Sequence, residues 1–191
     1  DGIRDIGVTG VQTCALPIYA AIVGLLPSRR EVLLSDSLVA QLEPEELASV
    51  FAHEVGHSRC NHVPTFLSWA LAFLLAGHLL ASAAAGAFPG ADLVVFAGVF
   101  SAWLLAFGWL SRRFELQADL FAMRTIGSGR PLVMALEKVG GNLRDIGSWR
   151  HFGTGRRAAF LVRAQSDEGW ARRFEERLRW IGHAEIGRAH G

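Results

Sequence analysis

Residues 53–57 spell H-E-V-G-H, and this pattern constrains the fold and chemistry of the chain more than any other stretch. In a helix, His53 and His57 lie one turn apart on the same face, close enough to share one metal ion. Neutral imidazole is a natural zinc ligand, and zinc lowers the pKa of a bound water molecule toward neutrality. Glu54 lies about 100° further round the helix, where its carboxylate can accept a proton from that water. The pattern predicts a hydrolytic zinc site; the alternative is a chance pair of histidines on a solvated face.

The residues around this motif predict a buried helix. Pro44 suits the first position of a helix, and Glu45 and Glu46 then face the positive end of its dipole. Gly56 is costly inside a helix, so we expect another backbone to approach closely there, near the metal. Apolar residues occupy several faces of the same helix: Leu47, Val50, Phe51, Ala52 and Val55.

The third metal ligand is expected further along the chain. A catalytic zinc site takes three protein ligands and keeps one position open. Residues 111–122 have a helical pattern with Glu115 and Asp119 on one face. We expect Glu115 to bind zinc and Asp119 to hold a ligand histidine by its other ring nitrogen. The alternative is an ordinary charged face paired with Arg112, and the upstream H-E-x-x-H motif outweighs it.

Together these segments resemble a family of membrane zinc metalloproteases that includes the CAAX prenyl proteases and the bacterial HtpX-type proteases. H-E-V-G-H, two long apolar segments and then S-R-R-F-E-L-Q-A-D-L-F-A carry the resemblance, and residues 32–38 and 45–47 resemble the family's lead-in. The resemblance covers residues 19–160. It implies the same ligand set of His53, His57 and Glu115, with Glu54 as the catalytic base and Asp119 supporting the site.

Two apolar segments without a charged residue, 65–88 and 93–110, separate the two halves of the predicted site. About twenty residues span the hydrocarbon core of a bilayer, so each segment is long enough. The chain is 51% hydrophobic with a mean hydropathy of +0.27, more apolar than an average soluble domain. We predict a transmembrane hairpin with a tight turn at residues 89–92. The alternative is a pair of buried helices in a soluble core.

A chain that crosses the membrane and returns brings Glu115 back to the side where His57 lies. Arg59, Arg112 and Arg113 also lie on that side, whereas the short linker has no Lys or Arg. The positive-inside rule then predicts a zinc site on the cytoplasmic face. We expect a multi-pass protein of the bacterial inner membrane.

Two further apolar runs, Tyr19–Leu26 and Glu31–Ser35, predict a β-hairpin with its turn at residues 27–30. It is either a core hairpin or an edge strand that pairs with an extended substrate, which is how metalloproteases of this kind hold peptides. Pro131 predicts the start of a short helix that ends at residues 140–141. An amphipathic helix is indicated by an apolar stripe further on: Trp170, Phe174, Leu178 and Ile181.

Four polar residues have less certain places in the expected site. His62 lies off the His53–His57 face and is expected to be structural rather than a ligand. His78 falls within the first apolar segment, where we favour helix packing or an internal hydrogen bond. His151 and Arg157 resemble a late His–Arg motif of the family, although Phe152 stands where the family has proline. His151 is a candidate to stabilise the oxyanion, and Arg157 to bind substrate or pair with Asp119; a surface pair is the alternative.

The two ends of the chain differ in kind from the rest. Residues 1–18 and 185–191 resemble translated sequencing adaptors, and we expect them not to be native. The expected domain is therefore 19–184, and the natural protein is expected to continue on both sides. A net charge of +1 gives no reason to expect nucleic acid as a partner.

We therefore predict a mainly α-helical fold with a small β-hairpin, in which zincin-like catalytic helices are joined through a two-helix transmembrane hairpin. The expected function is zinc-dependent hydrolysis of peptide bonds in membrane protein quality control, with a protein or peptide substrate, Zn²⁺ and the lipid bilayer as partners. The alternatives are a CAAX-type protease that processes prenylated proteins, a non-proteolytic zinc-binding sensor or scaffold, and a soluble metallopeptidase. An intact Glu54 speaks against the sensor, since a structural zinc site needs no base.

Overall fold

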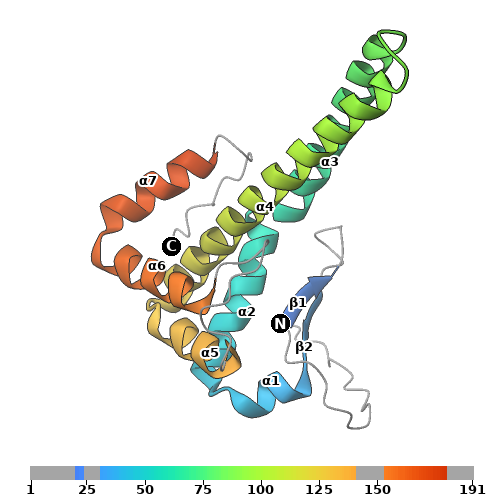
Figure 1. The fold of residues 1–191 in the computed structure, drawn as a ribbon. Helices are drawn as coiled ribbons and strands as arrows, with labels where there is room; N and C mark the ends of the chain where they lie inside the picture. The colour runs from blue at the N-terminus through green and yellow to red at the C-terminus, as the bar shows by residue number, and fades with distance from the viewer. Residues whose placement is uncertain (1–19, 24–30, 141–152, 180–191) are drawn as a thin grey trace, which may run out of the picture.

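The computed structural model describes residues 20–23, 31–140 and 153–179. This part of the chain is predominantly helical with one small sheet, which confirms the predicted fold class (Figure 1). Its elements, in chain order, are β1 (Ala20–Val23), β2 (Glu31–Leu34), α1 (Asp36–Gln41), α2 (Pro44–Arg59), α3 (His62–Ala84), α4 (Ala91–Ile126), α5 (Arg130–Gly140), α6 (Thr154–Ser166) and α7 (Glu168–Arg179).

The predicted β-hairpin is confirmed where the structure describes it. β1 and β2 are antiparallel, with Ala20 opposite Leu34 and Val23 opposite Glu31. Tyr19 and residues 24–30 lie outside the described residues. The sheet lies beside α2, which contacts β1 (Figure 1).

The predicted motif helix is α2, and its N-terminus forms as the sequence indicates. Pro44 is its first residue, and the Glu43 backbone N–H donates a 2.9 Å hydrogen bond to the Glu46 carboxylate. This bond satisfies one of the donors near the start of the helix. The α2 side chains that are buried include Ala52 and His53, so the motif faces the interior.

The two predicted membrane segments form an antiparallel helical pair, α3 and α4, that extends beyond the rest of the molecule (Figure 1). α3 ends at Ala84, and the connection covers residues 85–90, so it begins earlier than the predicted turn at 89–92. Gly86 explains the difference, because its left-handed φ of 92° ends α3. Ala91 and Asp92 already belong to α4.

Both helices are long and apolar enough to cross a membrane by length and composition. Their most apolar 18-residue windows are only 6% and 11% buried within the molecule. A pair of core helices in a soluble protein would have these side chains covered, so the exposure favours the transmembrane alternative. The most exposed apolar side chains of the pair are Leu74, Leu79, Leu93, Val94 and Leu105.

α4 is one continuous helix of 36 residues, about 54 Å long at 1.5 Å per residue. Its first part pairs with α3, and its last part runs into the body of the protein, where Leu116 and Leu120 are buried. A single rigid helix therefore carries both the second apolar segment and the predicted ligand Glu115.

The hydrophobic core surrounds the buried end of α4 and includes residues of α2, α5, α6 and α7. α5 confirms the helix predicted from Pro131. Trp170 and Phe174 of α7 pack against the core and Leu178 is buried, as the apolar stripe predicted. Ile181 lies outside the described residues.

Candidate metal centre

α2 and α4 cross at Gly56. A β-carbon on Gly56 would lie 3.1 Å from the Ala118 Cα and 3.2 Å from the Ala118 carbonyl oxygen. The close approach of another backbone, expected from the sequence, is thus confirmed. Because α4 passes so near, Glu115 lies opposite the two histidines of the motif.

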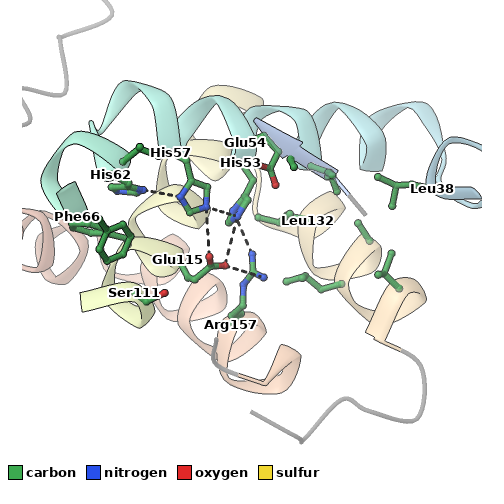
Figure 2. A pocket seen from close by; sticks show the side chains of 18 residues that line it. Leu38, His53, Glu54, His57, His62, Phe66, Ser111, Glu115, Leu132 and Arg157 are labelled. Carbon is green, nitrogen blue, oxygen red and sulfur yellow. Dashed lines mark hydrogen bonds and ion pairs between the residues drawn. The ribbon is translucent and has the colours of Figure 1, made fainter. Parts of the chain in front are cut away.

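Three potential ligand atoms converge at this crossing. His53 Nε2 and His57 Nε2 are 3.2 Å apart. The Glu115 carboxylate lies 3.8 Å from His53 Nε2 and 3.6 Å from His57 Nε2 (Figure 2). Ligand atoms about 2.1 Å from a tetrahedral zinc ion are about 3.4 Å apart, so these spacings fit such an ion. The same three residues form the one His/Cys/Asp/Glu group with such spacing in the part of the chain that the structure describes.

A buried carboxylate holds His53 from behind. Asp119 is fully buried, and its Oδ1 lies 2.9 Å from His53 Nδ1. Since an ionised carboxylate only accepts, His53 carries its proton on Nδ1 and presents the lone pair of Nε2 to the centre. This is the place expected for Asp119.

Arg157 of α6 completes the arrangement around Asp119. Its Nε donates a 2.9 Å hydrogen bond to Asp119 Oδ2, and its Nη2 donates to Oδ1. Its Nη1 lies 3.6 Å from the Glu115 carboxylate. The side chain is 12% exposed, and these carboxylates hold the pKa of Arg157 above its usual value against the opposing effect of burial. The structure thus places Arg157 in the Asp119 pair, one of the two roles that the sequence left open.

The second histidine, His57, is half-buried, with 18% of its side chain exposed. Burial and the neighbouring His53 and His62 hold the pKa of His57 well below its usual value, so its imidazole is neutral at physiological pH. A neutral imidazole is the form that binds a metal ion.

Glu54 lies next to the three converging atoms. It is half-buried and lines a cleft of about 730 Å³ together with His53, His57 and Glu115. Figure 2 shows Glu54 beside His53 on α2, with Glu115 and Arg157 on the other side of that histidine. Most of the remaining lining is apolar: Ala20, Ala21, Leu38, Val50, Val63, Phe66, Phe114, Leu132, Ala135, Leu136 and Val139.

Six of the seven site residues predicted from the sequence come together in this one cluster. The seventh, His151, lies outside the described residues, so its role stays a prediction. Sequence reasoning did not single out Gln117, which contacts His62. Helical periodicity places Gln117 away from the Glu115–Asp119 face, so the pattern held no signal for it.

The model of peptidase family M48 matches residues 13–166. The chain belongs to peptidase family M48. It is also 29% identical over 139 residues to a protein named "Protease HtpX homolog" from Chlorobium phaeobacteroides (strain BS1), which confirms the predicted resemblance.

The match to that relative covers 62% of this chain and 45% of the relative, so the chain spans less than half of the relative's length. No solved structure matches the chain. The M48 family is generally zinc-dependent, and the described residues contain a His/Glu group suited to a metal ion.

Proposed function

We propose that this M48 protein is a zinc-dependent membrane endopeptidase. The observation that carries the proposal is the convergence of ligand atoms from His53, His57 and Glu115 beside Glu54 in an open cleft. These residues would hold the ion and leave one position for water or substrate, as a catalytic site requires.

Zinc bound there supplies Lewis acidity to water and to the scissile carbonyl. Glu54 accepts a proton from the attacking water and later delivers it to the leaving amine. Asp119 keeps the proton of His53 on Nδ1, and Arg157 offsets the negative charge of the two buried carboxylates. The chain's own residues thus provide the base, the orientation of one ligand and the charge balance.

The shape and lining of the cleft support a peptide as the substrate. β1 contributes Ala20 and Ala21 to the lining, and within the described residues its only strand partner is β2. An extended peptide can add to the other edge of β1 through backbone hydrogen bonds. Leu132 and Leu136 of α5 then offer an apolar surface for one of its side chains.

The position of the cleft supports a role in membrane protein quality control. Phe66 of α3 and Phe114 of α4 line one part of it, so the cleft opens beside the apolar helix pair. An apolar segment of an unfolded membrane protein would suit both the apolar lining of the cleft and its position beside the helix pair. Arg59, Arg112 and Arg113 lie near this end of the pair and support a cytoplasmic site in a multi-pass protein of the bacterial inner membrane.

Cleavage of casein by the detergent-purified chain tests the proposal. We expect cleavage with zinc, none with a chelator, and none for Glu54→Gln. Chelator-resistant cleavage, or full activity of Glu54→Gln, would contradict it. Zinc binding at one ion per chain with no cleavage of any unfolded protein would favour the non-proteolytic alternative, and cleavage restricted to a prenylated C-terminal peptide would favour the CAAX-type alternative.

A further inference from the structure

His62 lies directly behind the second histidine of the motif. Its Nδ1 is 2.8 Å from His57 Nδ1, and its Nε2 is 3.1 Å from the side-chain oxygen of Gln117 (Figure 2 shows the first contact). The His62 ring stacks on Phe114, with centroids 4.1 Å apart and planes 6° apart. His62 is 1% exposed and Gln117 4% exposed, so water does not compete for these contacts.

The turn between α2 and α3 brings His62 to this place. In an uninterrupted helix, a residue five positions after His57 would point well away from it, about 140° round the axis. The chain instead breaks at Asn61, which has a left-handed φ of 54°, a conformation that asparagine tolerates better than most residues. α3 starts afresh at His62, whose side chain turns back onto His57.

We propose that His62, held by Gln117, is the positioning residue that fixes the ring orientation and the tautomer of His57. This inference rests on the proposed metal site. No contact of His62 is directed at the converging ligand atoms, so His62 acts through His57 and is not itself a ligand.

With the Gln117 amide oriented as in the structure, a donor and an acceptor can be assigned to each of these contacts. The Gln117 side-chain oxygen only accepts, so His62 carries its proton on Nε2. The Nδ1 of neutral His62 then accepts from His57, which carries its proton on Nδ1. His57 Nε2 is left with a lone pair that faces His53 and Glu115.

The opposite chain of donors is incompatible with the metal site. If the amide group of Gln117 were turned round, it would donate to His62 Nε2, and His62 Nδ1 would donate to His57 Nδ1. His57 would then carry a proton on Nε2, the atom that faces the centre. A metal ion therefore selects the first arrangement, and the Gln117 side-chain oxygen satisfies it by accepting from His62 Nε2.

The two motif histidines are thus held by different chemistry. His53 donates to the carboxylate of Asp119, which is ion-paired with Arg157, whereas His57 donates to a neutral imidazole. Both arrangements leave Nε2 unprotonated. Because neither Nε2 carries a proton, the lone pairs of two nitrogens 3.2 Å apart face one another. A cation bound to both nitrogens would offset their mutual repulsion.

The test is the Zn²⁺ affinity of the detergent-purified full chain, measured by competition with a chromogenic chelator. His62→Phe keeps an aromatic ring for stacking on Phe114 but has no ring nitrogen. We expect it to lower the affinity about 10- to 100-fold, as the loss of a group that holds a ligand usually does. Phe114→Leu keeps both hydrogen bonds and loses the stacking, so it should cost far less affinity. Equal losses for the two variants would contradict the positioning role.

A second pair of variants tests the same point without changing His62. Gln117→Glu keeps an oxygen that accepts from His62 Nε2, and Gln117→Leu removes it. We expect Gln117→Leu to weaken Zn²⁺ binding and Gln117→Glu to retain it. If both bind Zn²⁺ as the wild type does, Gln117 plays no part and the proposed chain of protons is wrong.

Nitrogen-15 NMR of the histidine rings in the zinc-loaded wild type reads the protons directly. We expect His57 to be protonated at Nδ1 and His62 at Nε2; the reverse would overturn the proposal. A wild-type chain that binds no Zn²⁺ would instead contradict the proposed function. A wild type that binds Zn²⁺ and a His62→Phe variant that binds it equally well would contradict the positioning role alone.

Discussion

Gly56 of α2 and Ala118 of α4 lie so close that a β-carbon on Gly56 would stand 3.1 Å from the Ala118 Cα. Two helices from distant parts of the chain therefore cross almost backbone to backbone, one residue before His57 and three residues after Glu115. The distance between the motif and its third ligand depends on this crossing. The packing of α2 on α4 at this crossing therefore also sets the geometry of the proposed metal site.

Replacing Gly56 by alanine should push the two helices apart. The added methyl group meets backbone atoms of Ala118, which cannot move without moving α4. We expect a loss of about 1–3 kcal/mol in the free energy of unfolding, together with weaker Zn²⁺ binding, because Glu115 moves with α4. Chemical denaturation and zinc titration in detergent measure the two effects.

Gly98→Ala provides the matched control for that change. Gly98 is also a glycine within a helix, but a β-carbon there meets nothing within 4 Å. This variant should bind Zn²⁺ as the wild type does and be at least as stable, since alanine favours helix. Equal behaviour of the two glycine variants would show that the crossing at Gly56 is unimportant.

Arg157→Met should lower the stability of the fold and the Zn²⁺ affinity, rather than the affinity for substrate. It leaves the fully buried Asp119 without its guanidinium partner, and breaking a buried ion pair costs about 3–5 kcal/mol. Denaturation of the metal-free protein measures this loss. Arg177→Met, at an exposed position of α7, should change stability by less than about 0.5 kcal/mol.

Peptidase kinetics of the same Arg157 variant separate its two candidate roles. A raised KM with unchanged stability and unchanged Zn²⁺ affinity would assign Arg157 to the substrate. Loss of stability together with Zn²⁺ affinity would assign it to the Asp119 pair, which is the result that the contacts predict.

Lys138→Met should destabilise the start of α2 in a pH-dependent way. Lys138 Nζ lies 2.7 Å from the buried carboxylate of Glu46. Burial raises the pKa of Glu46, but Lys138 and the Glu43 amide outweigh it and lower that pKa. Because Lys138 itself is 38% exposed, we expect a loss of only about 1–3 kcal/mol at neutral pH.

The sign of the pH dependence follows from the lowered pKa. A carboxyl group whose pKa is lowered by folding stabilises the fold above its unfolded pKa, and this contribution is lost as the pH falls through the folded value. The difference between Lys138→Met and the wild type should therefore shrink in acid. Denaturation of the metal-free protein across this pH range measures it; a difference that does not change with pH would contradict the pairing. Arg130→Met, at an exposed position of α5, is the control.

The helix pair should hold the chain in a bilayer. We expect the protein to stay in the membrane fraction after washing with carbonate. Leu105 is 73% exposed, so Leu105→Arg should be harmless if that surface faces water. In a bilayer the same change costs about 2.5–3.5 kcal/mol and should reduce insertion. Release of the wild type by carbonate, with no effect of Leu105→Arg, would favour the soluble alternative.

Much of the site was predictable because helical periodicity links spacing to geometry. The i, i+4 spacing places His53 with His57 and Glu115 with Asp119, and Gly56 indicated the close crossing. The β-hairpin and the helix pair followed from apolar runs and their breaks. These predictions depend on residues that are near one another in sequence, or on the apolar hairpin that returns the chain to the side where His57 lies.

The contacts of His62 were not predictable in the same way. They depend on one left-handed residue, Asn61, and on the rotation of α4 that directs Gln117 toward His62. No periodic pattern encodes either. The wall of the cleft formed by α5 likewise depends on how helices distant in sequence pack, and its apolar residues look like ordinary core residues in the sequence.

The most direct test of the central claim is the zinc content of the purified chain and its variants, measured by elemental analysis after dialysis. We predict one zinc ion per chain for the wild type and for Glu54→Gln, and little or none for His53→Ala, His57→Ala and Glu115→Ala. Circular dichroism checks that each variant is helical. A wild type without zinc, or a Glu115→Ala variant that retains a full equivalent, would contradict the proposed site.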